Sequence, residues 1–161
     1  MKKKQSKIKK HLVKSLASLI SVSIVVVAVA YYFIFDKKLI GPLFLLMGLG
    51  NLIFMQIMQV HLKFIYPDLA FGFMDNGVMV FAAIIGGTLG GVTGAIVGGV
   101  AGNTITDGLG GFFEGYIAEK QIEKTKFESK RKMLSGSLGK MTGCMFGAGF
   151  SLTIIWLISL I

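Results

Sequence analysis

Polar positions divide the chain into long apolar stretches. Five stretches consist almost wholly of apolar and small residues: 15–35, 39–62, 69–85, 92–116 and 136–161. Each is close to the ~20 residues that a helix needs to cross a bilayer. A chain in lipid must satisfy its own backbone hydrogen bonds, which a helix does within one segment. The pattern therefore predicts an all-α, polytopic membrane protein with five transmembrane helices.

Short polar segments predict the connections between these helices. We expect Asp36 to Lys38 to form a turn. We expect Lys63 to Asp68 to form a connector in which Pro67 starts the next helix and Asp68 caps it. Gly86 to Gly91 predicts a tight reversal between the third and fourth helices.

Glycines recur with a period of four at positions 86, 90, 94, 98 and 102. This spacing puts them on one face of a helix, as in the small-xxx-small patterns that let membrane helices approach closely. A phosphate-binding loop is disfavoured because no Gly-Lys-Ser/Thr follows and no strand precedes the run.

Composition agrees with the hydropathy pattern. The chain is 53% hydrophobic and only 16% charged, and its mean hydropathy is +0.73. The net charge of +9 is segregated, with seven lysines in the first fourteen residues and seven Lys/Arg between Lys120 and Lys140. These clusters flank apolar spans, so they indicate membrane topology and contact with anionic lipid headgroups rather than nucleic-acid binding.

The basic clusters predict the orientation. Four predicted spans separate them, so both fall on one side, and the positive-inside rule puts the N-terminus inside. We expect a basic cytoplasmic tail over 1–14, two N-terminal transmembrane helices over 15–62 and a core over 69–161 that includes a polar helical extension over 117–133. No convincing signal or mitochondrial presequence precedes the first span, which favours a prokaryotic cell membrane.

Three of the eight carboxylates lie at membrane depth: Asp75, Asp107 and Glu114. Asn103, Asp107 and Glu114 are spaced to lie along one helix face. A carboxylate within a membrane span marks an ion path or functional site by default. Because a short turn joins the third and fourth helices, we expect Asp75 and Asp107 to lie at similar depth and to converge.

Neutral oxygens lie near the same level, on Asn76, Asn103, Thr104 and Thr106. Carboxylate and amide oxygens suit hard cations such as calcium. His11 and His61 stand alone, which makes a zinc or copper site unfavourable. The alternative for the polar residues is hydrogen bonding between helices. The chain has no cofactor motif and no nucleophile–base pair, so we expect no enzyme.

One chain offers few helices around such a site. The glycine face and the polar face together suggest that two copies meet, with the sites near a shared interface. The sequence therefore predicts a homodimer.

Three motifs in order carry a resemblance to a known family. Phe71 to Met79 (FGFMDNGVM), Gly102 to Glu114 with its GN, TD, G and E positions, and Leu138 to Cys144 are similar to helices of the transmembrane protein sixty-five family of mitochondrial inner-membrane proteins. The similarity covers roughly 69–155, and residues 15–62 have no counterpart in it. Gly102 to Asp107 (GNTITD) also resembles the repeat signature of cation/calcium exchangers.

The resemblance implies sodium/calcium exchange, with both ions as transported ligands. Residue by residue, it implies an ion-binding set made of Asp75, Asn76, Asn103, Thr106, Asp107 and Glu114. Among these, Asp75, Asn103, Asp107 and Glu114 are the expected metal ligands. The alternatives are a divalent-cation channel or magnesium-type permease using the same acids, and a non-transporting membrane scaffold or regulator.

Overall fold

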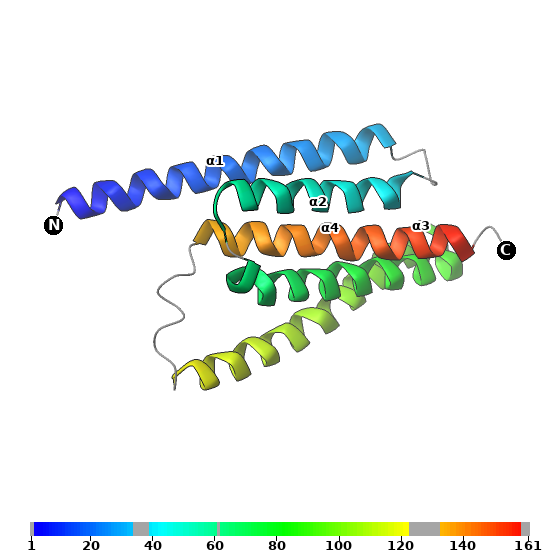
Figure 1. Cartoon of the computed structure of the whole chain (residues 1–161). Coiled ribbons are helices and arrows are strands. Elements are labelled where there is room, and N and C mark those ends of the chain that lie inside the picture. Colours follow the sequence, from blue (N-terminus) through cyan, green and yellow to red (C-terminus); the bar gives the residue numbers. More distant parts are fainter. Residues whose placement is uncertain (1, 34–38, 61, 123–132, 159–161) are drawn as a thin grey trace.

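Four helices make up the computed structural model, which describes residues 2–33, 39–60, 62–122 and 133–158. In chain order they are α1 (Lys2–Phe33), α2 (Ile40–Ile57), α3 (Leu62–Ile122) and α4 (Met133–Ile158). The described residues thus form an all-helical fold, as the hydropathy pattern predicts (Figure 1). The predicted turn at Asp36–Lys38 and the end of the polar extension, residues 123–132, lie outside the described residues.

Helix α3 is a hairpin rather than one rod. Gly90 and Gly91 leave the helical conformation, and Gly91 has a φ of 58°, which glycine adopts without a steric penalty. We call residues 62–89 the first arm and residues 92–122 the second arm. The two arms lie side by side near this bend (Figure 1). The chain reverses within the predicted segment Gly86–Gly91. The bend is shorter than predicted, because the helix continues through Gly86 to Leu89.

Glycines bring the two arms of α3 together. A Cβ on Gly94 would contact the carbonyl of Gly86, and a Cβ on Gly98 would contact the carbonyl of Ala82. One turn further on, a Cβ on Gly102 would lie 3.0 Å from the Cα of Met79. The period-four glycines therefore serve close helix packing, as predicted, and four of the five, all but Gly90, do so between the arms of one chain.

Helix α4 lies between α2 and the first arm of α3 (Figure 1). On one face, a Cβ on Gly143 would contact the carbonyl of Leu69, and a Cβ on Gly147 that of Phe73. On another face, a Cβ on Gly149 would lie 2.8 Å from the backbone nitrogen of Leu45 in α2. Small residues thus let α4 pack closely on two neighbours at once.

A buried amide ties α2 to α4. Asn51 Nδ2 donates to the Oγ1 of Thr142 at 2.7 Å and lies 3.4 Å from the carbonyl of Leu138. Thr142 itself is fully buried and donates to the Leu138 carbonyl at 2.8 Å. Asn51 therefore provides hydrogen bonding between helices, as polar side chains in membrane helices commonly do.

The junction between α2 and α3 differs from the prediction. Helix α3 begins at Leu62, so Pro67 and Asp68 lie inside the helix and the predicted connector over Lys63–Asp68 is wrong. The chain turns earlier, where Gln59 adopts a left-handed φ of 58°. Its N–H donates to the Gln56 carbonyl at 2.9 Å, and that of Val60 to the Met55 carbonyl at 3.0 Å, which is the Schellman pattern of a helix end.

Replacing Gln59 with glycine is expected to stabilise the protein by about 0.5–1 kcal/mol, because glycine avoids the steric cost of the left-handed conformation. Thermal or denaturant unfolding in detergent measures the change. The control is Gln56→Gly, an exposed helical position where glycine is expected to cost about 1 kcal/mol. Equal destabilisation by both changes would contradict the assigned role of Gln59.

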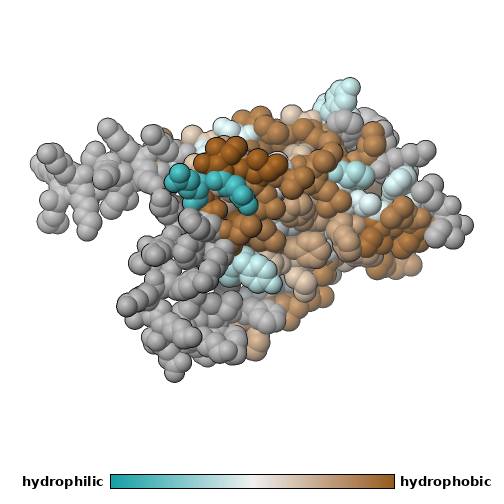
Figure 2. All heavy atoms as spheres, in the orientation of Figure 1, coloured by the Kyte–Doolittle hydropathy of each residue, from teal (hydrophilic) through white to brown (hydrophobic). Residues whose placement is uncertain are grey.

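The described surface is strongly apolar (Figure 2). Four segments within the described helices are long and apolar enough to cross a membrane: Ser15–Tyr32, Ile40–Ile57, Ile65–Phe112 and Leu134–Ile158. The third spans 48 residues and contains the hairpin bend. These features indicate a membrane-embedded protein.

The described basic segments share one end of the bundle. The lysine-rich beginning of α1, the beginning of α3 at Leu62, the end of α3 at Ile122 and the beginning of α4 at Met133 all lie at this end (Figure 1). The end of α1, the Gly90–Gly91 bend and the end of α4 lie at the opposite end (Figure 1).

Candidate functional site

The hairpin holds one carboxylate at its inner face. Asp75 is 8% exposed, and its Oδ1 accepts a hydrogen bond of 2.6 Å from the Oγ1 of Thr106 on the opposite arm. That length is typical of a hydroxyl donating to a carboxylate. Thr106 is 4% exposed, and its Oγ1 also lies 3.0 Å from the carbonyl oxygen of Asn103 and 3.1 Å from that of Gly102. Asp75 therefore has a fixed partner across the hairpin.

Asp75 lies near the middle of the first arm. It follows Leu62 by thirteen residues and precedes Gly90 by fifteen, so it is about 20 Å from either end of the arm at the helical rise per residue. The early start of α3 places the carboxylate further from the helix end than the predicted start at residue 69 would. An ionised carboxylate this far from either end of a membrane helix is costly unless polar partners or a bound ion compensate its charge.

A second polar pair lies on the second arm. Asn103 Nδ2 donates to the Oδ2 of Asp107 at 2.9 Å, and Asp107 is exposed while Asn103 is half-buried. Thr106, rather than Asp107, takes the position opposite Asp75. The sequence predicted that Asp75 and Asp107 converge. In the structure Asp75 instead contacts Thr106 inside the hairpin, and Asp107 pairs with Asn103 outside it.

Two further predicted residues flank these pairs. Asn76 is half-buried and follows Asp75 directly on the first arm. Glu114 lies on the second arm, seven residues beyond Asp107, and its side chain lies outside the described part of the structure.

An aromatic side chain lies one turn from Asp75 toward the basic end. The Phe71 ring occupies the space where a Cβ on Gly110 would lie, so the missing side chain of Gly110 admits the ring between the arms. Lys140 Nζ lies 4.0 Å from the centroid of this ring, a cation–π contact. A cavity of about 380 Å³, lined partly by Phe71, Leu109 and Thr106, lies between the arms here.

The ion-binding set predicted from the sequence did not include Phe71, Gly110 or Lys140. Local signals for them exist, because Phe71 precedes Asp75 by four residues and Gly110 follows Thr106 by four. Lys140 interrupts the last apolar stretch, as an ionisable residue in a membrane helix does at functional positions.

The oxygen donors of one chain do not form a dense cluster. Within the described residues, no group of three or more Asp, Glu, His or Cys side chains lies close enough to hold a metal ion. One hairpin offers the Asp75 carboxylate with the Thr106 hydroxyl, and separately the Asp107 carboxylate with the Asn103 amide. Each pair can supply part of a hard cation's oxygen shell, which takes six or more ligands in total.

Comparisons with known proteins return nothing for this chain: no protein-family profile, no curated protein and no solved structure matches it.

Proposed function

We propose that this protein is a secondary-active cation transporter that exchanges sodium for calcium across a membrane. The observation that carries the proposal is the buried Asp75, held between two apolar helical arms and hydrogen-bonded to Thr106. Acidic groups within membrane helices serve ion pathways far more often than structure, because an ionised group there is costly to keep. Ion sites of secondary transporters also commonly lie near the bilayer midplane.

The resemblance of residues 69–155 to the transmembrane protein sixty-five family supports the choice of ions. On this proposal, Asp75, Thr106 and Asn76 line the inner site, and Asn103, Asp107 and Glu114 extend it along the second arm. The bound ions are calcium or sodium, which compete for the same oxygens. The protein crosses a prokaryotic cell membrane five times, with its basic end in the cytoplasm.

A homodimer completes this proposal. An exposed carboxylate in an apolar arm is unfavourable toward lipid, and Asp107 lies on an arm that also exposes Val100, Ile105 and Leu109. A second copy that covers this face of the second arm would shield the Asn103–Asp107 pair. It would also add oxygen donors to a site for which one chain offers few.

One observation favours an alternative within the same class. A cage of three or more carboxylates is not found in the described part of the chain. Magnesium keeps several waters and is held by one or two carboxylates, so sparse acids also suit a magnesium-type permease or a divalent-cation channel.

Ion flux into proteoliposomes distinguishes these functions. With sodium inside and radiolabelled calcium outside, exchange predicts calcium uptake that requires the outward sodium gradient and stops when sodium is equal on both sides. A channel predicts uptake that follows the membrane voltage without sodium, and a magnesium-type permease predicts that excess magnesium abolishes calcium entry.

Absence of any flux above empty liposomes, with the protein shown to be folded and inserted, would reject transport. The remaining function would then be a membrane scaffold or regulator.

A further inference from the structure

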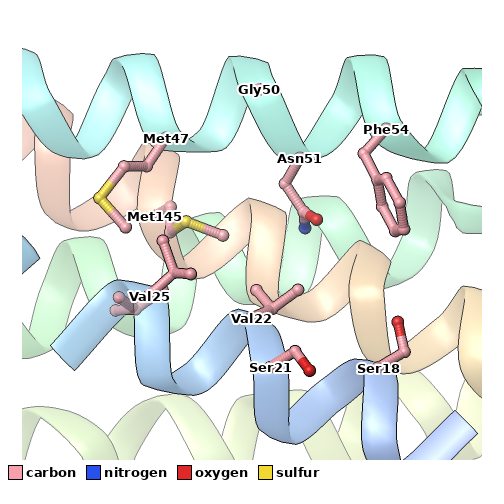
Figure 3. A pocket seen from close by; sticks show the side chains of 10 residues that line it. Ser18, Ser21, Val22, Val25, Met47, Gly50, Asn51, Phe54 and Met145 are labelled. Carbon is pink, nitrogen blue, oxygen red and sulfur yellow. The ribbon is translucent and has the colours of Figure 1, made fainter. Parts of the chain in front are cut away.

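A second cavity lies on the other side of the bundle, between α1 and α2. Its volume is about 580 Å³, and apolar side chains form most of its wall. Val22 and Val25 of α1 point toward Met47 and Phe54 of α2, with Met145 of α4 behind them (Figure 3). None of these residues belongs to the α3 hairpin, so the cavity is separate from the proposed ion site.

The cavity is elongated along the helices. Ser18 of α1 lies beside Phe54 of α2 at one end, and Val25 lies beside Met47 at the other (Figure 3). The seven residues from Ser18 to Val25 correspond to about 10 Å along the axis. The length of the cavity and its mostly apolar wall suit part of a lipid acyl chain.

One end of the cavity adjoins the basic end of the bundle. Ser18 follows Lys14 by four residues on α1, about 6 Å along the axis, and six more lysines precede Lys14. Lysines near a membrane surface attract anionic lipid by about 1 kcal/mol each.

We propose that this cavity is a binding site for one anionic glycerophospholipid. One acyl chain lies in the groove between α1 and α2, and the phosphate headgroup lies at the lysine-rich beginning of α1. Lipid tails are as apolar as the groove, so burial of the chain gives little preference for one lipid over another. Headgroup charge therefore determines the selectivity. The proposal is independent of ion transport.

The test uses the full-length protein in nanodiscs that contain a trace of phospholipid with a photoactivatable diazirine in its acyl chain. Phosphatidylglycerol and phosphatidylcholine probes are compared, and the labelled peptides are mapped by mass spectrometry. We expect labelling of residues 18–25 and 47–54, with a preference of about fivefold or more for phosphatidylglycerol. Equal labelling by the two probes, or labelling spread evenly over all helices, would overturn the proposal.

Two variants separate the chain site from the headgroup site. Gly50 lines the cavity, and a Cβ there meets nothing within 4 Å, so Gly50→Phe fills the groove and is expected to abolish the labelling. Gly108→Phe, at an equally open glycine on α3, is the matched control and is expected to leave it intact.

Exchanging Lys10 and Lys14 for glutamine is expected to remove the preference for phosphatidylglycerol while labelling of the groove persists. An unchanged preference would overturn the headgroup assignment. If Gly50→Phe does not fold, the ratio between the two probes on the unmodified protein still decides the proposal.

Discussion

Replacing Asp75 with asparagine is expected to reduce sodium-driven calcium uptake by at least about tenfold, a loss of roughly 1.4 kcal/mol or more in ion-binding free energy. Asparagine has nearly the same shape, and its side-chain oxygen can still accept the hydrogen bond from Thr106. The change therefore removes the charge while it preserves the contact between the arms. Uptake into proteoliposomes, normalised to the amount of inserted protein, measures the effect.

Stability distinguishes a functional carboxylate from a structural one. A neutral amide is less costly than a carboxylate in an apolar setting, so Asp75→Asn is expected to unfold at the same temperature as the parent protein or at a higher one. The matched control is Asp68→Asn, the same chemical change about two turns earlier on the same arm, and we expect it to retain uptake. Full transport by Asp75→Asn would refute the site, and loss of folding would assign Asp75 to structure.

Replacing Gly98 with alanine is expected to have the largest effect on the fold. Alanine normally favours a helix by about 1 kcal/mol over glycine. At Gly98, however, the added methyl group meets the backbone carbonyl of Ala82, which has no freedom to rotate away. The arms must separate, and overpacking of this kind costs about 1–3 kcal/mol. The midpoint of thermal unfolding in detergent measures this loss.

Gly108→Ala provides the matched control for this substitution. Gly108 lies on the same arm, and a Cβ there meets nothing within 4 Å. Only the helix propensity of alanine acts at this position, so its unfolding midpoint should rise or stay unchanged. If both variants respond alike, the close approach of the arms at Gly98 does not contribute to stability.

Local patterns predicted much of the architecture. The apolar stretches correspond to the helices, and the glycines near Gly90 mark the bend of α3. The connector before the third predicted span was wrong because Pro67 was interpreted as a helix start. In the structure α3 begins five residues before Pro67, so this proline lies inside the helix and leaves the carbonyl four residues earlier without its backbone donor.

Helix rotation explains where the site prediction and the structure differ. Asn103, Asp107 and Glu114 share one face of a helix, and the spacing makes that face look like the functional one. In the structure the second arm instead turns Thr106 toward Asp75, because Gly102 and Gly110 pack against the first arm on that face. Neighbouring residues on a helix differ by about 100° in direction, so one position separates a buried partner from an exposed carboxylate.

The sequence by itself determined the apolar helices, the grouping of basic residues, the reversal near Gly90 and the set of polar residues within the apolar helices. These properties depend on composition and on neighbours a few residues apart. Only the tertiary structure decided that Asp75 meets Thr106, that Phe71 lies between Gly110 and Lys140, and that α4 lies between α2 and α3. Those contacts join residues far apart in the chain, and close packing of small residues, rather than local hydropathy, sets how each helix is rotated.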